Sequence, residues 1–381
     1  MKKSTKLALG TAGAAALGLA AVLQYPKAIT KKKRIFPRPR VLSELSGIAK
    51  ANPRLADLMW LASHDSFSDQ ITRSSKMDPV ETQKGSPFAL PGIIPLTKGI
   101  AARFSRAQNL NAMEQLNAGV RMLDIRLTWY NNTYYTRHSI LSGPFEPYLR
   151  QILRFLADIE SPGEIVFLYF LDIVLPEGKT KSHTLNWLAE IRENGKNIFD
   201  YVPYSTQDAA GAPRLAVDLH YNEVTNGGTE SGAVLFMREN ELPQEPYFNK
   251  IFSLDASFHA PWANQVRDSK MTAFYAEREA EAAERRTAGE TDKFYIMQAQ
   301  KTPCFHTVAD AIGAVRGWSL LDIAAHSNAR LVEEGILDRW FTGDVQVILV
   351  DNVNCTRADF NHIINKKLHM YNAAVVERLQ P

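Results

Sequence analysis

The sequence of 381 residues has few cysteines, little net charge and no long apolar run, and each shortage narrows the class of protein. The two cysteines, Cys304 and Cys355, have no metal-binding spacing. They could pair in an oxidising compartment, and two unpaired small apolar side chains are the equal alternative. A net charge of +3 gives no case for nucleic-acid binding. The most apolar stretch, residues 7–23, is Gly-rich and shorter than the roughly 20 residues of a stable membrane span.

Residues 1–34 have the pattern of a signal peptide or membrane anchor. Three lysines among the first six residues precede the uncharged stretch, as in an export signal. Four basic residues at 31–34 follow it, and a basic flank on that side favours an uncleaved anchor over simple export. We therefore expect a secreted or cell-surface, membrane-associated protein in which residues 35–381 form one domain.

Beyond this segment, short apolar runs alternate with helical stretches. The run at 345–350 is continuous, which favours strands covered on both faces, as in a parallel sheet. The strands are predicted at 58–63, 122–127, 164–171, 233–237, 252–254, 294–298 and 345–350, and the helices within 145–159, 185–191 and 271–287. About eight strands with intervening helices predict an α/β fold, an irregular or distorted TIM-type βα barrel. Periodicity alone leaves an open doubly wound sheet as the alternative.

Titratable residues stand at the ends of the first and last predicted strands. His64 and Asp65 follow the first strand, and Asp351 ends the last. The carboxyl ends of the strands are where catalytic groups of a βα barrel lie. Histidine suits general acid–base work because its ordinary pKa is near neutrality. These positions therefore predict an acid–base site at one end of the barrel.

A second group lies on the strand at 122–127 and just after it. Asp124 and Arg126 are two residues apart, so they share one face of the strand, where charges are costly unless paired or in a polar site. Residues 127–138 predict a hairpin that turns at Asn-Asn and returns His138. A guanidinium can donate two hydrogen bonds to one phosphate group. Arg126, which lies between His64 and His138 in the sequence, therefore suits cleavage of a phosphodiester.

Four stretches resemble the phosphatidylinositol-specific phospholipases C. Residues 62–66, Ala-Ser-His-Asp-Ser, are similar to the GTHDS or GTHNS stretch of that family, and residues 115–126 are similar to its QLxAGIRxxDIR stretch. Residues 164–167 resemble its third strand, and residues 347–352 its final strand, which ends in an aspartate. The similarity extends over about residues 55–365, and the first two motifs are specific in combination.

The resemblance implies a catalytic role for each of five residues. His64 matches the general base and Asp351 the carboxylate that orients it. His138 matches the general acid and Asp65 the carboxylate that supports it. Arg126 matches the phosphate-stabilising arginine of the bacterial, metal-independent members. The implied reaction converts a phosphatidylinositol-type lipid into diacylglycerol and an inositol cyclic phosphate.

The resemblance also bears on the metal and the headgroup. Calcium-dependent members have a carboxylate ligand where this chain has Arg126, so the resemblance implies a site without metal or cofactor. Arg238 and Asp255 match headgroup-binding residues, and together with Asp124 they are the predicted substrate-binding set. In contrast, Leu171 aligns with a lysine that contacts inositol in some members. Another headgroup, such as a glycosylated inositol lipid, and a non-catalytic lipid-binding barrel are therefore the alternatives.

Two further departures concern a turn and an excursion. Ser139 stands where the family has a glycine after the second histidine. Residues 77–104 have no clear counterpart; they are rich in proline and apolar groups, with basic residues nearby. We expect this excursion to contact a membrane surface, with a packed loop as the alternative.

Several site residues also have plainer structural interpretations. Asp124 and Arg126 could form a buried structural ion pair. Asp351 could cap a helix over residues 356–368, and Arg238 could make a surface salt bridge.

Overall fold

The computed structural model describes residues 40–80, 94–238, 247–303 and 319–380. Its strands are β1 (Trp60–Ser63), β2 (Met122–Tyr130), β3 (Thr133–His138), β4 (Ile140–Pro144), β5 (Ile165–Val174), β6 (Gly232–Met237), β7 (Ile251–Ser253), β8 (Phe258–His259), β9 (Phe294–Gln298) and β10 (Val347–Val350). They form one sheet in the order β7-β6-β5-β2-β1-β10-β9-β8, and all neighbours on this path are parallel. The antiparallel strands β3 and β4 extend from β2.

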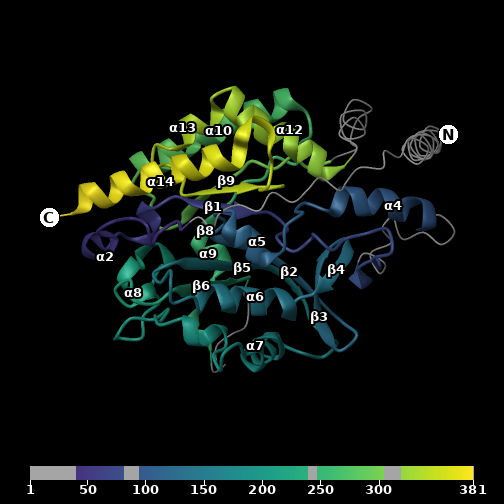
Figure 1. Cartoon of the computed structure of the whole chain (residues 1–381), viewed down its shortest axis with the longest axis horizontal. Coiled ribbons are helices and arrows are strands. Elements are labelled where there is room, and N and C mark those ends of the chain that lie inside the picture. Colours follow the sequence, from purple (N-terminus) through teal and green to yellow (C-terminus); the bar gives the residue numbers. More distant parts are fainter. Residues whose placement is uncertain (1–39, 81–93, 239–246, 304–318, 381) are drawn as a thin grey trace.

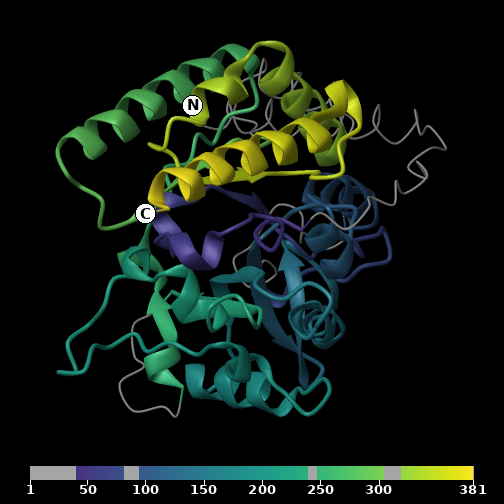
Figure 2. The ribbon, with the colours of Figure 1, turned by 60° about the vertical axis from the view of Figure 1, so that its left-hand side comes forward.

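Helices lie around the outside of this sheet. The α-helices are α2 (Ile48–Ala51), α4 (Ile94–Ser105), α5 (Ala112–Asn117), α6 (Glu146–Leu156), α7 (Lys181–Glu190), α8 (Tyr221–Thr225), α9 (Leu254–Ser257), α10 (Asp268–Thr287), α12 (Leu320–Glu333), α13 (Ile336–Trp340) and α14 (Phe360–Leu379). The 3-10 helices are η1 (Leu55–Asp57), η3 (Ile198–Tyr201), η4 (Ala216–Asp218), η5 (Phe248–Lys250) and η6 (Arg357–Asp359). Helices α10, α12, α13 and α14 lie together on one side of the molecule, and α6 and α7 lie on the opposite side (Figures 1 and 2).

Contacts between aromatic side chains on the inner face of the sheet show that the sheet is curled into a barrel. Phe258 on the terminal strand β8 packs against Phe236 on β6, with ring centroids 4.6 Å apart. Phe167 on β5 packs on Trp60 from β1 at 4.6 Å and on Phe294 from β9 at 5.8 Å. Strands from both ends of the sheet therefore share one aromatic interior. No pairing joins β7 to β8 in the described ranges, so the barrel is open there.

A buried ion pair fixes the amino-terminal end of β5. The Nε of Arg121 lies 2.8 Å from Oε2 of Glu164, and both side chains are almost fully buried. The other Glu164 oxygen accepts hydrogen bonds from the backbone N–H groups of Leu42 and Ser43, at 3.1 and 3.0 Å. The Arg121 guanidinium also lies over the ring of Phe155, 4.8 Å from its centroid. Because its polar atoms are matched, this buried pair ties the start of the described chain to the barrel.

The predicted barrel is confirmed, with differences at its edges. All seven predicted strands are present, and the predicted hairpin is formed by β2 and β3. The two-residue strand β8 was not predicted, because two residues carry no periodic pattern. The predicted helix at 356–368 is α14, which begins at Phe360 and has Asp359 at its N-cap. The interpretation of Asp351 as a helix cap is therefore wrong.

Some expectations fall outside the described residues. Residues 1–34, Cys304 and residues 81–93 of the 77–104 excursion belong to this group, so the export segment, the cysteine pair and the lipid contact of the excursion remain predictions. Residues 94–104 of the excursion are part of α4. Cys355 is buried, and its thiol lies 3.5 Å from the carbonyl oxygen of Ala325. Within the described ranges, no helix is both long enough and apolar enough to cross a bilayer.

Candidate active site

Strand pairing brings together His64 and Asp351, which are 287 positions apart. β1 and β10 are parallel, with Ser63 opposite Val350, so the next residue of each strand emerges at the same end of the barrel. Nδ1 of His64 lies 2.7 Å from Oδ1 of Asp351, whose side chain is 1% exposed. A neutral ring that donates its Nδ1–H to this carboxylate keeps a lone pair on Nε2. That arrangement suits a general base.

Gln108 holds this end of the β1–β10 pair, and the sequence interpretation missed it. Its fully buried amide donates to the carbonyl oxygens of His64 and Val350, both at 3.0 Å. Its Oε1 accepts from the N–H of Val353 at 3.1 Å. Gln108 lies in an irregular segment without a motif, so no local signal could have identified it.

The second histidine lies across the site, at the end of β3. His138 Nδ1 is 3.0 Å from Oδ2 of Asp65 and 2.9 Å from the carbonyl oxygen of Ser105, at the end of α4. The rings of His64 and His138 are 6.0 Å apart between centroids and nearly perpendicular. Ser139 has a φ of 59°, so a serine adopts the left-handed conformation at the position where the family has glycine.

Arg126 lies between these pairs and contacts both of them. Its Nε is 2.9 Å from Oδ1 of Asp65, and its Nη2 is 3.0 Å from Oδ2 of Asp124. The same Nη2 lies 3.0 Å from Nε2 of His64. Asp124 Oδ2 also accepts the backbone N–H of Asp65 at 3.0 Å. The Asp124–Arg126 ion pair is thus real, and it is part of the site rather than remote from it.

The charges of the site act strongly on His64. Burial lowers the pKa of His64, but the carboxylates of Asp65 and Asp351 outweigh it and raise the pKa to about 9. Burial also raises the pKa of Asp351, so both shifts keep a proton within the pair. The contact with Arg126 fits only the neutral ring, since a guanidinium donates and needs the Nε2 lone pair. Proton removal from His64 therefore precedes its use as a base.

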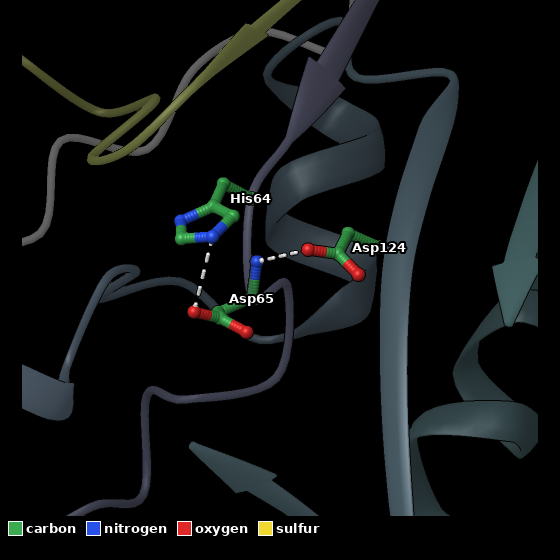
Figure 3. A group of neighbouring side chains, drawn as sticks. All are labelled: His64, Asp65 and Asp124. Atoms are coloured by element: carbon green, nitrogen blue, oxygen red, sulfur yellow. Dashed lines mark hydrogen bonds and ion pairs between the residues drawn. The ribbon is translucent and has the colours of Figure 1, made fainter. Parts of the chain in front are cut away.

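Three potential metal ligands lie in the same site. Ligand atoms of His64, Asp65 and Asp124 all lie within 4.8 Å of one another, and Figure 3 shows these side chains gathered at the carboxyl end of β1. Each of the three also contacts Arg126, at 2.9 to 3.0 Å. The guanidinium thus places a fixed positive charge beside every one of these ligands, where a cation would be repelled.

The predicted headgroup residues lie farther out. Arg238 follows β6, and its Nε is 3.6 Å from Oδ1 of Asp255 in α9. Their side chains are 55% and 65% exposed, so this pair lies at the surface of the barrel mouth. Leu171 is half-buried near the end of β5. The structure therefore brings the five predicted catalytic residues and Asp124 into one cluster and leaves Arg238 and Asp255 as a separate exposed pair.

Comparisons with known proteins agree with this fold. No family model matches the chain. A human PI-PLC X domain-containing protein 2 is 27% identical over 281 residues, which cover 73% of this chain and 81% of the relative. A human PI-PLC X domain-containing protein 3 is 24% identical over 272 residues, which cover 68% and 73%. The variant-surface-glycoprotein phospholipase C of Trypanosoma brucei brucei is 36% identical over 98 residues, only 25% of this chain and 26% of that relative.

Solved structures of bacterial enzymes have the same fold. The phosphatidylinositol-specific phospholipase C of Listeria monocytogenes superposes with a TM-score of 0.53 at 16% identity, covering 86% of this chain and 97% of that one. A variant of the Staphylococcus aureus enzyme gives a TM-score of 0.53 at 15% identity and covers 86% and 99%. At such low identity the likeness concerns the fold, which is a distorted TIM-type barrel. The chain is a homologue of the PI-PLC X domain-containing proteins with the fold of the bacterial phosphatidylinositol-specific phospholipases C.

Proposed function

We propose that this protein is a phospholipase C that cleaves phosphatidylinositol-type lipids by general acid–base catalysis. The observation that carries the proposal is the arrangement of two histidine–carboxylate pairs on either side of one arginine. Each pair has its own aspartate, so one histidine can be neutral while the other is protonated. The likeness to relatives named for phospholipase C activity supports the same conclusion.

The proposed reaction follows from these positions. Arg126 turns its donors from His64 to the phosphoryl oxygens of the bound lipid, which frees Nε2 of His64. His64 then takes the proton of the inositol 2-hydroxyl, and the oxygen of that hydroxyl attacks phosphorus. The bond between phosphorus and the glycerol oxygen breaks, and His138 supplies the proton that the leaving oxygen needs. The products are diacylglycerol and an inositol cyclic phosphate.

Phosphorus NMR of the products formed from phosphatidylinositol vesicles tests this proposal. We expect a cyclic phosphodiester signal with the wild-type protein. His64→Ala and His138→Ala should each lower turnover by about 10²- to 10⁴-fold, the usual contribution of general acid–base catalysis. His369→Ala, in an exposed position on α14, is the matched control and should keep full activity. Unchanged turnover in both active-site variants would overturn the catalytic proposal and favour a lipid-binding barrel.

A glycosylated inositol lipid is a second candidate substrate. Leu171 stands where some relatives have an inositol-contacting lysine, so one polar contact to the ring is missing. In addition, one relative is named as a phospholipase C for a variant surface glycoprotein. Vesicles that contain either phosphatidylinositol or a glycosylated inositol lipid, at equal surface density, separate the two candidates. The better substrate has the higher kcat/KM.

The proposed substrate places the reaction at a membrane surface. A lipid headgroup is reached from the aqueous side, so the barrel mouth must face the bilayer during turnover. We propose that residues 77–104 contribute to this contact and that residues 1–34 direct export or anchor the protein. Comparing the full chain with a variant that lacks residues 1–34 in cell fractionation tests the second part. Identical distributions would refute a targeting role.

A further inference from the structure

Tyr169 lies on the floor of the barrel mouth. Phe167, two positions earlier on β5, points into the aromatic interior, so Tyr169 faces the same way. In the strand register, Tyr169 is opposite Asp124 on β2 and Phe236 on β6. Its ring packs on Phe258 across the open side of the barrel, with centroids 5.0 Å apart. Tyr169 therefore belongs to the same layer of the barrel as Asp124.

The hydroxyl of Tyr169 has no hydrogen-bond partner among the residues that the structure describes, although its side chain is only 7% exposed. The hydroxyl oxygen is nevertheless not among the buried side-chain atoms that lack a partner, so it opens to solvent and can bind a ligand. Burial, together with the nearby charge of Asp124, raises the pKa of Tyr169 far above neutrality. The phenol is therefore a neutral donor at every working pH.

The charged groups of both halves of the mouth act on this phenol. Asp124 and Arg126 influence it from the catalytic side, and Arg238 and Asp255 from the exposed pair. Tyr169 thus lies between the reacting groups and the predicted headgroup residues, which are otherwise separate. Strand β5 pairs with β2 on one side and with β6 on the other, so a ligand that extends from Arg126 toward Arg238 crosses the strand that holds Tyr169.

We propose that Tyr169 is a headgroup-binding residue whose phenol donates a hydrogen bond to a ring hydroxyl of a polyol headgroup. This rests on the proposed function, in which His64 must reach a headgroup hydroxyl while Arg126 holds the phosphate. Strand β1 pairs with β2, and β2 pairs with β5. His64 and Tyr169 are therefore two strands apart in one layer. Two strand spacings make about 10 Å, a gap that one six-membered polyol ring with its hydroxyls bridges.

Tyr169→Phe removes only the hydroxyl and tests the proposal. Tyr201→Phe is the matched control, because Tyr201 is 6% exposed and lines a cavity at the opposite end of the barrel with Pro162 and Ser231. Two quantities are measured for each variant: inhibition by free myo-inositol and the kinetic constants for phosphatidylinositol. For Tyr169→Phe we expect about 3- to 10-fold weaker inositol binding and a matching rise in KM, as for loss of one neutral hydrogen bond. Tyr201→Phe should match the wild type in both.

A panel of monodeoxy-inositol ligands identifies the bonded hydroxyl. For the one ligand that lacks this hydroxyl, the wild type and Tyr169→Phe should bind with equal affinity. For the other ligands, the wild type should bind more tightly than Tyr169→Phe. Such a pattern does not arise from a structural defect. Equal inositol binding by wild type and Tyr169→Phe, measured by calorimetry and by competition, would overturn the inference. A wild type that binds inositol through Tyr169 but fails to cleave phosphatidylinositol would instead refute the proposed reaction.

Discussion

Replacing Asp351 by asparagine tests how the site controls its base. The carboxylate lies 2.7 Å from His64 Nδ1 and is 1% exposed, so its charge acts on the ring with little screening by water. Asparagine keeps the shape and one acceptor oxygen but removes the charge. Asp351→Asn should therefore lower the pKa of His64 from about 9, and an opposite charge at this range typically contributes about 1–3 pH units.

The same shift predicts a change in stability with pH. The folded-state pKa of His64 lies above its ordinary value of 6.5, so protonation of His64 stabilises the folded protein. This contribution is fully present below pH 6.5 and disappears as the pH rises through about 9. A difference of 2.5 units, from 6.5 to about 9, corresponds to about 3 kcal/mol of unfolding free energy. Between pH 6.5 and about 9, the unfolding free energy of Asp351→Asn should fall much less than that of the wild type.

Two measurements check this reasoning. The first is kcat/KM as a function of pH, in which the limb that rises with pH reports the free base. In the variant this limb should move to lower pH, and the maximal rate should fall by about 10²- to 10⁴-fold because the ring is less well oriented. The second is urea unfolding of both proteins at pH 6 and pH 9.5. An unmoved limb, or equal pH dependence of stability in both proteins, would show that Asp351 does not set the pKa of His64.

The remaining predictions concern the metal, the core and the lipid surface. Excess chelator should leave turnover unchanged, whereas Arg126→Ala should lower kcat by about 10²- to 10³-fold; calcium-dependent activity of the wild type would contradict the metal-free site. Glu164→Gln should lower the unfolding free energy by about 3–5 kcal/mol in urea titrations, because it leaves the buried Arg121 unpaired. A loss below about 1 kcal/mol would mean that the pair is dispensable. Ile93→Ser with Ile94→Ser should weaken vesicle co-sedimentation but spare turnover of a soluble short-chain lipid; equal binding would exclude this contact.

Local pattern predicted most of the barrel but not its closure. Continuous apolar runs such as 345–350 identified the central strands, because strands buried on both faces need apolar residues throughout. The strand β8 is two residues long and has no pattern of its own. Its identity depends on pairing with β9, which is set by the rest of the sheet. The opening between β7 and β8 could not be predicted for the same reason.

The site divides in a similar way. Residue type and motif identified the catalytic candidates and the positive charge of Arg126. They could not identify the carbonyl of Ser105 beside His138, since every residue has a carbonyl and only its position matters. Nor could they identify Gln108, whose amide holds two strand ends together. Tyr169 was hidden within an apolar strand, where its hydroxyl had no stated role.

By itself, the sequence determined the order of strands and helices and the chemical groups at the strand ends, because periodicity and side-chain type are local properties. The family resemblance implied the pairs His64–Asp351 and His138–Asp65, but only the tertiary structure shows that these side chains are in contact and that Arg126 contacts both pairs. These contacts join residues far apart in the chain, and they depend on which strands are neighbours and in which register. Parallel pairing of β10, β1, β2 and β5 is therefore the physical reason that scattered polar residues form one site.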